Sequence, residues 1–176
     1  MKEKEIIDTK MLEKIKMVII NEEIMKKLDF DCGDEDLNDF IHNDALKHLY
    51  EDLAVTYLCV IDEIVLGFVS ISNASIKISK KDKKEMEYKY PEFPSVRVGR
   101  LAIDKKYEGK GIGSYIIDWV FGKCEDMGYE VGIRFVSVDA YKDVVGFYKK
   151  NKFFIKDNTK KNIPMYFDLK KYKNEN

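Results

Sequence analysis

The chain has 176 residues, 45% of them apolar, and a formal net charge of −1. This is enough apolar material for one buried core, so we predict a single domain over residues 1–176. The balanced charge excludes a generic nucleic-acid binder, which would carry a strong basic excess.

Cysteine usage and the N-terminal sequence bear on the compartment. Cys32, Cys59 and Cys124 lack metal-type spacing and leave one thiol over in any disulfide scheme. We therefore expect reduced, mainly buried thiols in a cytoplasmic protein. Residues 1–10 are charged throughout, and the apolar run at residues 18–20 is too short to cross a bilayer, so neither a leader peptide nor a membrane partner is expected.

The first third of the chain predicts a short strand and then a helical segment. The strand lies near Met17–Ile20. Asp34 is a suitable N-cap, and acidic residues fill the turn that follows it. Apolar residues then recur at intervals of three and four, which predicts one helix or a pair of short helices that pack by one face. These residues are Leu37, Phe40, Ile41, Ala45 and Leu49.

The two histidines lie in this helical segment. His42 and His48 are six residues apart, so they do not share a helix face as neighbours three or four apart would. Neither has a recognisable partner in the sequence. We interpret both as structural and predict no metal site.

A hairpin is predicted between Ala54 and Ser72, because two runs rich in Val, Ile, Thr, Tyr and Phe flank a turn at Asp62-Glu63. Pro91 and Pro94 then interrupt regular structure. Residues 75–100 hold eight basic and four acidic side chains, a surplus of four. Two interpretations stay open: a solvated loop, or a patch for an anionic substrate such as tRNA.

The stretch Val96–Ser114 holds the strongest functional pattern. An alternating apolar run leads into a glycine loop with Gly109, Gly111 and Gly113, and apolar residues at helical spacing follow. A strand, glycine turn and helix start can aim several backbone N–H groups at one anion, which predicts a pyrophosphate site. The spacing fits neither a Walker loop nor a Rossmann fingerprint, and a tight turn with no ligand is the alternative.

The last third of the chain predicts three strands and two helix ends. Gly128 closes the helix that follows the glycine loop. A short helix from Val144 should end with Asn151 as a left-handed cap, before a strand that starts near Phe153. The other two strands are expected at Val131–Val138, with Asp139 and Ala140 ending it, and at Ile163–Leu169.

Two motifs resemble the GNAT superfamily of N-acyltransferases. Gly111-Ile112-Gly113 matches the family's acetyl-CoA loop, and Leu101–Asp104 matches its central strand. The pair Phe147-Tyr148 follows in the family's order. Glu108 departs from the pattern, because the family has Gln or Arg there; we expect it to point away and Lys110 to supply the countercharge. The resemblance spans Phe30–Phe154 and implies an α/β (α+β) fold: a mixed, mostly antiparallel sheet flanked by helices.

One subgroup is closer than the rest. Phe30-Asp31-Cys32-Gly33, followed by Leu37-Asn38 and Phe40, resembles the opening of the GNAT toxins of toxin–antitoxin pairs. That resemblance implies an acetyl-CoA-dependent transfer to a primary amine, with aminoacyl-tRNA as acceptor and a ribbon-helix-helix antitoxin as partner. A monomer and a homodimer both fit the sequence.

The resemblance also implies roles for individual residues. Tyr148, the counterpart of the family's tyrosine near the CoA sulfur, would protonate the departing thiolate. Arg97, Arg100 and Asp139 are the expected acceptor-binding residues. Backbone groups of Leu101, Ala102 and Ile103 would hold the pantetheine arm and polarise the carbonyl, and the pyrophosphate would be held by Gly109, Lys110, Gly111, Gly113 and Ser114.

A general base is missing from the central strand. Ser95–Ile103 contains no carboxylate or histidine, so a lysine amine with a pKa of about 10 would lack a proton acceptor, whereas an α-amino group at about 8 needs less help. Asp104, Asp139 or a residue from another strand stays open as the base. The alternatives to an aminoacyl-tRNA acceptor are a small amine, a protein N-terminus, or a non-catalytic CoA-binding module.

Overall fold

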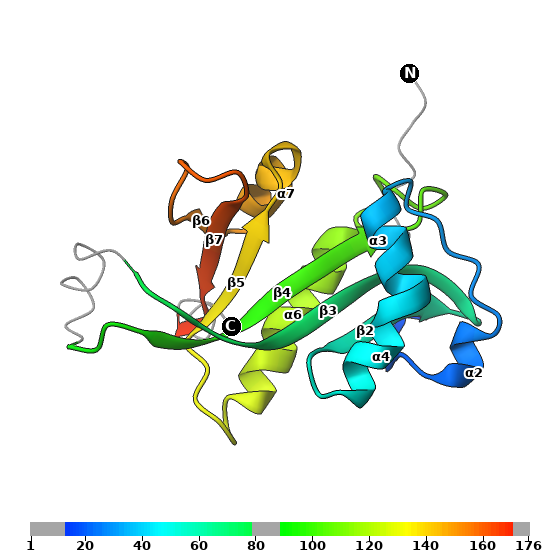
Figure 1. Cartoon of the computed structure of the whole chain (residues 1–176), viewed down its shortest axis with the longest axis horizontal. Helices are drawn as coiled ribbons and strands as arrows, with labels where there is room; N and C mark the ends of the chain where they lie inside the picture. The colour runs from blue at the N-terminus through cyan, green and yellow to red at the C-terminus, as the bar shows by residue number, and fades with distance from the viewer. Residues whose placement is uncertain (1–12, 79–88, 171–176) are drawn as a thin grey trace. The chain divides into compact units, whose positions relative to one another are not determined.

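The computed structural model describes residues 13–78 and 89–170 (Figure 1). These residues form two compact units. Unit 1 holds the described residues up to Ser72 and Gly99–Ile117, and unit 2 holds the remaining described residues. The strand order is β1-β2-β3-β4-β5-β7-β6. Of the pairs with a described register, β4–β5 is parallel and the others are antiparallel. The predicted mixed, mostly antiparallel sheet flanked by helices is therefore confirmed.

Unit 1 begins with three antiparallel strands, β1 (Lys16–Ile19), β2 (Val55–Ile61) and β3 (Ile64–Ile76). The predicted hairpin is β2–β3, and a bulge between Cys59 and Val60 shifts its register. Its turn places Asp62 at φ 45° and Glu63 at φ 71°. Two successive positive φ values match the right-handed twist of the strands, so the turn closes tightly although neither residue is glycine.

Three short helical elements follow one another in unit 1 after α2 (Glu22–Met25): α3 (Glu35–Asp39), the π-helical turn η1 (Phe40–Asp44) and α4 (Ala45–Tyr50). The predicted N-cap is confirmed, because the Asp34 side chain accepts a hydrogen bond from the Leu37 amide at 2.9 Å. The wider π turn inserts one residue into the helical period, so Phe40, Ile41 and Ala45 are all buried.

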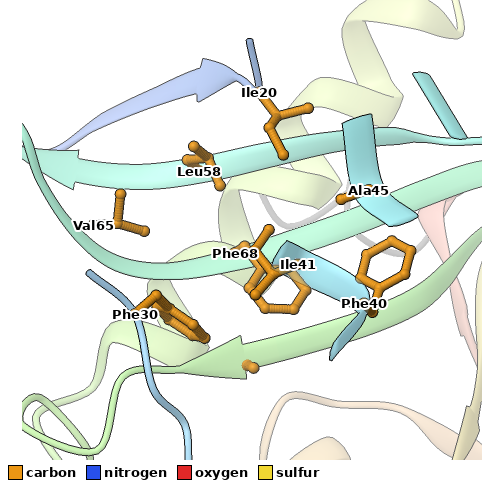
Figure 2. Close-up of a cluster of buried hydrophobic side chains, with 9 residues drawn as sticks. Ile20, Phe30, Phe40, Ile41, Ala45, Leu58, Val65 and Phe68 are labelled. Carbon is orange, nitrogen blue, oxygen red and sulfur yellow. The ribbon is translucent and has the colours of Figure 1, made fainter. Parts of the chain in front are cut away.

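These helices cover a cluster of buried side chains that also receives residues from the strands (Figure 2). Phe68 of β3 is the central ring: it meets Phe30 edge-on at 5.4 Å and Phe40 at 6.0 Å between centroids. Each fully buried phenylalanine contributes about 2–3 kcal/mol of transfer free energy. The other members are Ile20, Ile41, Ala45, Leu58, Val65 and Ala102.

The end of β4 (Phe93–Ile103) and the start of α6 (Ile112–Met127) complete unit 1. Gly67 of β3 lies against both: a Cβ there would stand 2.8 Å from the Ala102 carbonyl oxygen and 2.7 Å from Ile103 Cδ1. A glycine is therefore required at position 67, because any side chain would overlap the strand end that precedes the glycine loop.

Unit 2 contains the first half of β4, which pairs with β5 (Phe135–Ala140) from Ser95 to Val98. β7 (Ile163–Asp168) lies beside β5, and β6 (Phe154–Ile155) is the edge strand. The 3-10 turn η2 (Lys142–Val144) leads into α7 (Val145–Lys150). Phe121 of α6 stacks on Phe167 at 3.9 Å.

Three boundary predictions were wrong. The strand predicted from Val131 starts at Phe135, where the registers with β4 and β7 begin. Arg134, just before it, is bonded through its amide to the Pro94 carbonyl and through its side chain to Asp168. Pro94 does not interrupt β4 but is its second residue, near the strand end where a missing N–H costs little. Asn151 has φ −90°, and Lys152 takes the left-handed position at φ 64°. The Asn151 side chain instead donates to the Phe147 carbonyl.

The prediction of free, mainly buried thiols is confirmed, because none of the three cysteines forms a disulfide and Cys59 and Cys124 are buried. The His42 ring lies 3.0 Å from the Phe30 carbonyl, and the His48 ring packs edge-on against Phe40. Within residues 13–78 and 89–170, no helix is long and apolar enough to cross a membrane.

Candidate functional site

The predicted pyrophosphate loop connects β4 to α6 in unit 1. After Ile103 the chain turns at Asp104 and enters α6 at Ile112, whose side chain is buried. Gly109 and Gly111 adopt positive φ values of 74° and 88°. Nothing lies within 4 Å of a Cβ built on either glycine, so their role is the backbone conformation and not a lack of space.

The loop amides are available to a ligand. In the described part of the chain, the amides of Gly109, Gly111 and Gly113 donate to no backbone carbonyl, and the first helical bond of α6 runs from the Tyr115 amide to the Gly111 carbonyl at 3.1 Å. The positive end of the α6 dipole adds to these unpaired donors. A loop of this kind fits the diphosphate of acetyl-CoA.

Three side chains of the loop bear on the expected phosphate site: Glu108, Lys110 and Ser114. Glu108 is exposed to solvent, and Lys110 lies over the Tyr107 ring with Nζ 5.8 Å from its centroid. Ser114 is half-buried in the first turn of α6. Lys110 and Ser114 therefore remain candidate partners of the phosphates, and Glu108 is free to point into water.

The strand residues expected to meet the pantetheine arm alternate between two environments. Ala102 is 5% exposed and belongs to the cluster of Phe40 and Phe68, whereas Leu101 and Ile103 are half-buried. The described register of β4 with β5 ends at Val98, before these residues. Beyond Val98, the backbone groups of β4 on the edge away from β3 are thus the ones that could make sheet-like bonds to a ligand.

Tyr148 lies on α7 in unit 2. It is 5% exposed, and its ring packs edge-on against Phe147 at 5.0 Å and Phe153 at 5.3 Å. Burial raises the pKa of Tyr148 to about 12. A phenol with such a pKa keeps its proton throughout the neutral range, which suits a proton donor and excludes a tyrosinate base.

The three predicted acceptor-binding residues are divided between the two units. Arg97 and Asp139, on the paired strands β4 and β5 of unit 2, form an exposed ion pair with each other. Arg100 belongs to unit 1, and its guanidinium lies 4.0 Å from the centroid of the Phe40 ring. Asp139 is therefore engaged by a cation, and Arg100 is held over an aromatic face by a cation–π contact.

The second candidate base, Asp104, is also engaged. It is 1% exposed, and its carboxylate accepts hydrogen bonds from the amides of Asp31 at 3.1 Å and Lys106 at 2.8 Å. Both oxygens of the Asp104 carboxylate are therefore occupied by backbone amides of the protein.

Sequence reasoning missed the residues that bond to the start of the glycine loop around Asp104. Asp31 accepts from Gly33 and Asn38 and pairs with the Lys105 ammonium. The hydrogen bonds from Lys105 and Asn38 hold the pKa of Asp31 well below its usual range. Asp31 and Asn38 belong to the segment Phe30–Phe40 that resembles the GNAT toxins, so the sequence did single out this segment. It did not reveal the contact with Asp104, which lies 73 positions further along the chain.

Thiol and metal chemistry have little support. Burial raises the pKa of both Cys59 and Cys124 to about 12, so neither thiol is a nucleophile at neutral pH. Burial also raises the pKa of Cys32. No group of three or more His, Cys, Asp or Glu residues that could hold a metal ion occurs among the described residues.

Comparison with known proteins gives consistent matches. The tRNA-acetylating toxin of Mycobacterium tuberculosis (strain ATCC 25618 / H37Rv) is 25% identical over 114 residues, which are 65% of this chain and 69% of the toxin. AtaT complexed with acetyl-methionyl-tRNAfMet is 22% identical, with a TM-score of 0.80 over 92% of this chain and 98% of AtaT.

Two further solved structures share the fold. A tyrosine-to-phenylalanine mutant of KacT is 22% identical, with a TM-score of 0.83 over 93% of this chain and 99% of KacT. AtaTR bound with AcCoA is 22% identical, with a TM-score of 0.73 over 93% and 98%. The sequence model of the acetyltransferase (GNAT) family matches residues 20–153. The chain therefore belongs to the acetyltransferase (GNAT) family.

Proposed function

We propose that this acetyltransferase N-acetylates the α-amino group of aminoacyl-tRNA in the cytoplasm, with acetyl-CoA as donor. The observation that carries the acceptor class is the similarity to a tRNA-acetylating toxin over 65% of the chain. The structural likeness to AtaT complexed with acetyl-methionyl-tRNAfMet supports the same class.

The glycine loop and the end of β4 are the proposed cosubstrate site. Acetyl-CoA supplies an activated acyl group as a thioester. The amides of Gly109, Gly111 and Gly113 would hold its diphosphate, with Lys110 and Ser114 as side-chain partners. Backbone groups of Leu101, Ala102 and Ile103 would bond the pantetheine arm, and their N–H groups would polarise the acyl carbonyl. In the described chain these three glycine amides donate to no backbone carbonyl, which supports this assignment.

Tyr148 is the proposed catalytic acid. Its phenolic oxygen would hold a proton in the neutral range and donate it to the departing sulfur. The pKa of about 12 supports a protonated side chain. Solved structures of KacT and of AtaT include mutants in which one tyrosine is replaced by phenylalanine.

The acceptor class agrees with the state of the two candidate bases that the sequence named. Asp104 and Asp139 are bonded to amides and to Arg97 respectively. An α-amino group, with a pKa of about 8, is partly neutral at pH 7 and can attack without a strong base. A lysine amine, at about 10, would be almost wholly charged. The engagement of these two candidate bases therefore favours an aminoacyl ester over a lysine side chain.

The test is acetylation of purified methionyl-tRNA, followed by mass spectrometry of the released amino acid. We expect N-acetyl-methionine only with charged tRNA and acetyl-CoA present. Free methionine, a peptide N-terminus and uncharged tRNA are the matched controls. Equal or faster acetylation of free methionine or the peptide would overturn the tRNA proposal and leave a small-amine or N-terminal acetyltransferase.

An antitoxin is the proposed protein partner. Solved structures show AtaT bound to the C-terminus of the antitoxin AtaR, without and with acetyl-CoA, and the AtaT–AtaR complex bound to DNA. We propose that a ribbon-helix-helix antitoxin binds this chain in the same way. A neighbouring gene for such a protein, whose product co-purifies with the acetyltransferase and suppresses its activity, is the expected result; a product that neither binds nor inhibits would contradict it.

A further inference from the structure

The segment Phe30–Asn38, called the opening motif below, contacts the end of β4, although the two are far apart in the sequence. Asp31 and Asp104 are separated by 73 positions, yet the Asp31 amide donates to Asp104 Oδ2 at 3.1 Å. The Lys105 amide donates back to the Asp31 carbonyl at 3.0 Å. This reciprocal pair of bonds joins the motif to the first residues of the glycine loop.

Asp104 holds three pieces of chain together. Its amide donates to the Leu66 carbonyl of β3 at 2.9 Å, Oδ2 accepts from Asp31, and Oδ1 accepts from the Lys106 amide at 2.8 Å. The carboxylate is 1% exposed. Its two oxygens therefore satisfy two buried or half-buried amides that would otherwise lack a partner.

Asp31 is itself fixed by short-range bonds. Oδ1 accepts from the Gly33 amide and from Asn38 Nδ2, each at 2.8 Å, and Asn38 Oδ1 accepts from the Cys32 amide at 3.0 Å. Oδ2 pairs with the Lys105 ammonium. The motif is thus a preformed unit, and it presents its backbone to Asp104 in one orientation.

Among the described residues, the amides of the three loop glycines give the loop no backbone hydrogen bond of their own. Gly109 and Gly111 have positive φ values, the amides of Gly109, Gly111 and Gly113 donate to no backbone carbonyl of the described chain, and Ile112 is the buried residue at its far end. The direction of the amides therefore depends on where the loop starts. That start is the turn at Asp104.

We infer that Asp104 and Asp31 are positioning residues that set where β4 ends and the glycine loop begins, and hence the aim of the loop amides at the diphosphate of acetyl-CoA. The inference rests on the proposed cosubstrate site and deepens it. Preorganised donors lower the cost of ordering a loop when an anion binds. Neither carboxylate needs to touch the cosubstrate for this.

The test is Asp104→Asn, measured by calorimetry with CoA and by hydrogen exchange of the free protein. The amide nitrogen of Asn would face one of the two backbone N–H groups, so one donor loses its acceptor. We expect CoA to bind about tenfold more weakly or worse, and the amides of Gly109, Gly111 and Gly113 to exchange faster without ligand. In turnover, KM for acetyl-CoA should rise by a similar factor, with kcat within about threefold.

Asp29→Asn is the matched control. This substitution removes the same charge two residues before Asp31. The Asp29 carboxylate lies 3.1 Å from the Lys106 ammonium, but 90% of its side chain is exposed. CoA affinity and loop exchange should stay within twofold of wild type. If Asp104→Asn does not fold, Asp31→Ala and Asn38→Ala replace it, since each removes part of the same network at half-exposed positions.

The outcomes separate the proposals. CoA affinity and loop exchange in folded Asp104→Asn, or in both replacement variants, equal to those of Asp29→Asn would overturn the inference. A fall in kcat with unchanged KM would also overturn it. A wild-type protein that binds CoA but does not acetylate charged tRNA refutes the acceptor proposal alone, whereas a folded wild type that binds no CoA refutes the cosubstrate site and this inference together.

Discussion

The glycine loop and Tyr148 belong to different units, and different interactions hold them in place. The loop depends on hydrogen bonds: Asp104 accepts from two amides, and two glycines take positive φ. Tyr148 depends on ring packing against Phe147 and Phe153. The loop should therefore respond to changes of backbone conformation and charge, while the tyrosine should tolerate loss of its hydroxyl without structural change.

Tyr148→Phe is the sharpest test of this contrast. The ring and its contacts with Phe147 and Phe153 stay, but the proposed proton donor is lost. We expect kcat to fall about 10²- to 10⁴-fold, the range of general acid catalysis, with CoA affinity unchanged. Steady-state kinetics and calorimetry with CoA measure the two effects.

The control for this change is Tyr141→Phe. Tyr141 is 48% exposed and precedes η2, so the same loss of a hydroxyl should leave kcat unchanged. Full activity of Tyr148→Phe would refute the acid role. If wild-type protein binds CoA but acetylates neither charged tRNA, nor free amino acids, nor peptide N-termini, the chain is a non-catalytic CoA-binding module.

Arg134→Met tests how much the buried ion pair Arg134–Asp168 of unit 2 contributes to the free energy of unfolding. Arg134 bonds Asp168 through two nitrogens at 2.8 and 2.9 Å, with the side chains 16% and 9% exposed. Removing the cation leaves a buried carboxylate, so the free energy of unfolding should fall by about 3–5 kcal/mol in urea titrations.

The exposed pair Arg97–Asp139 is the comparison for that change. Its side chains are 50% and 41% exposed, so Arg97→Met should cost about 0–1 kcal/mol. An equal loss in Arg97→Met and Arg134→Met would show that burial does not decide the cost of these ion pairs.

Glycine substitutions separate conformation from packing. Gly111→Ala forces a side chain into φ 88°, which costs about 1–2 kcal/mol of unfolding free energy and should weaken CoA binding. Gly122→Ala, inside α6 with nothing within 4 Å of the new Cβ, should instead stabilise by about 0.5–1 kcal/mol. Thermal unfolding and calorimetry measure both; a stabilised Gly111→Ala with wild-type CoA affinity would contradict the conformational role.

Local patterns in the sequence predicted much of this molecule. The Asp34 cap, the β2–β3 hairpin, the glycine loop before α6 and the end of that helix at Gly128 all depend on residues within a few positions of one another. Such features follow from capping, alternation and backbone preference. The same reasoning singled out the loop glycines, whose conformation the structure describes.

The errors and omissions have a different cause. The strand predicted from Val131 begins at Phe135, and the bond between Asp31 and Asp104 joins segments 73 positions apart. The π turn at Phe40–Asp44 was also missed, because one inserted residue leaves the apolar spacing almost unchanged. Pairing partners and ion pairs such as Arg134–Asp168 are set by tertiary contacts, on which periodicity is silent.

The smallest expected effect is a pH dependence of stability that comes from Asp31. The Lys105 and Asn38 bonds lower the folded-state pKa of Asp31 below its ordinary 3.8. A lowered folded pKa stabilises the native state above pH 3.8, and that contribution is lost as the pH falls further. The free energy of unfolding should therefore decline less steeply between pH 5 and about 2 in Asp31→Asn than in wild type. Asp29→Asn should keep the wild-type slope in the same urea titrations, and identical slopes in all three proteins would show that Asp31 is not held as an anion by the loop.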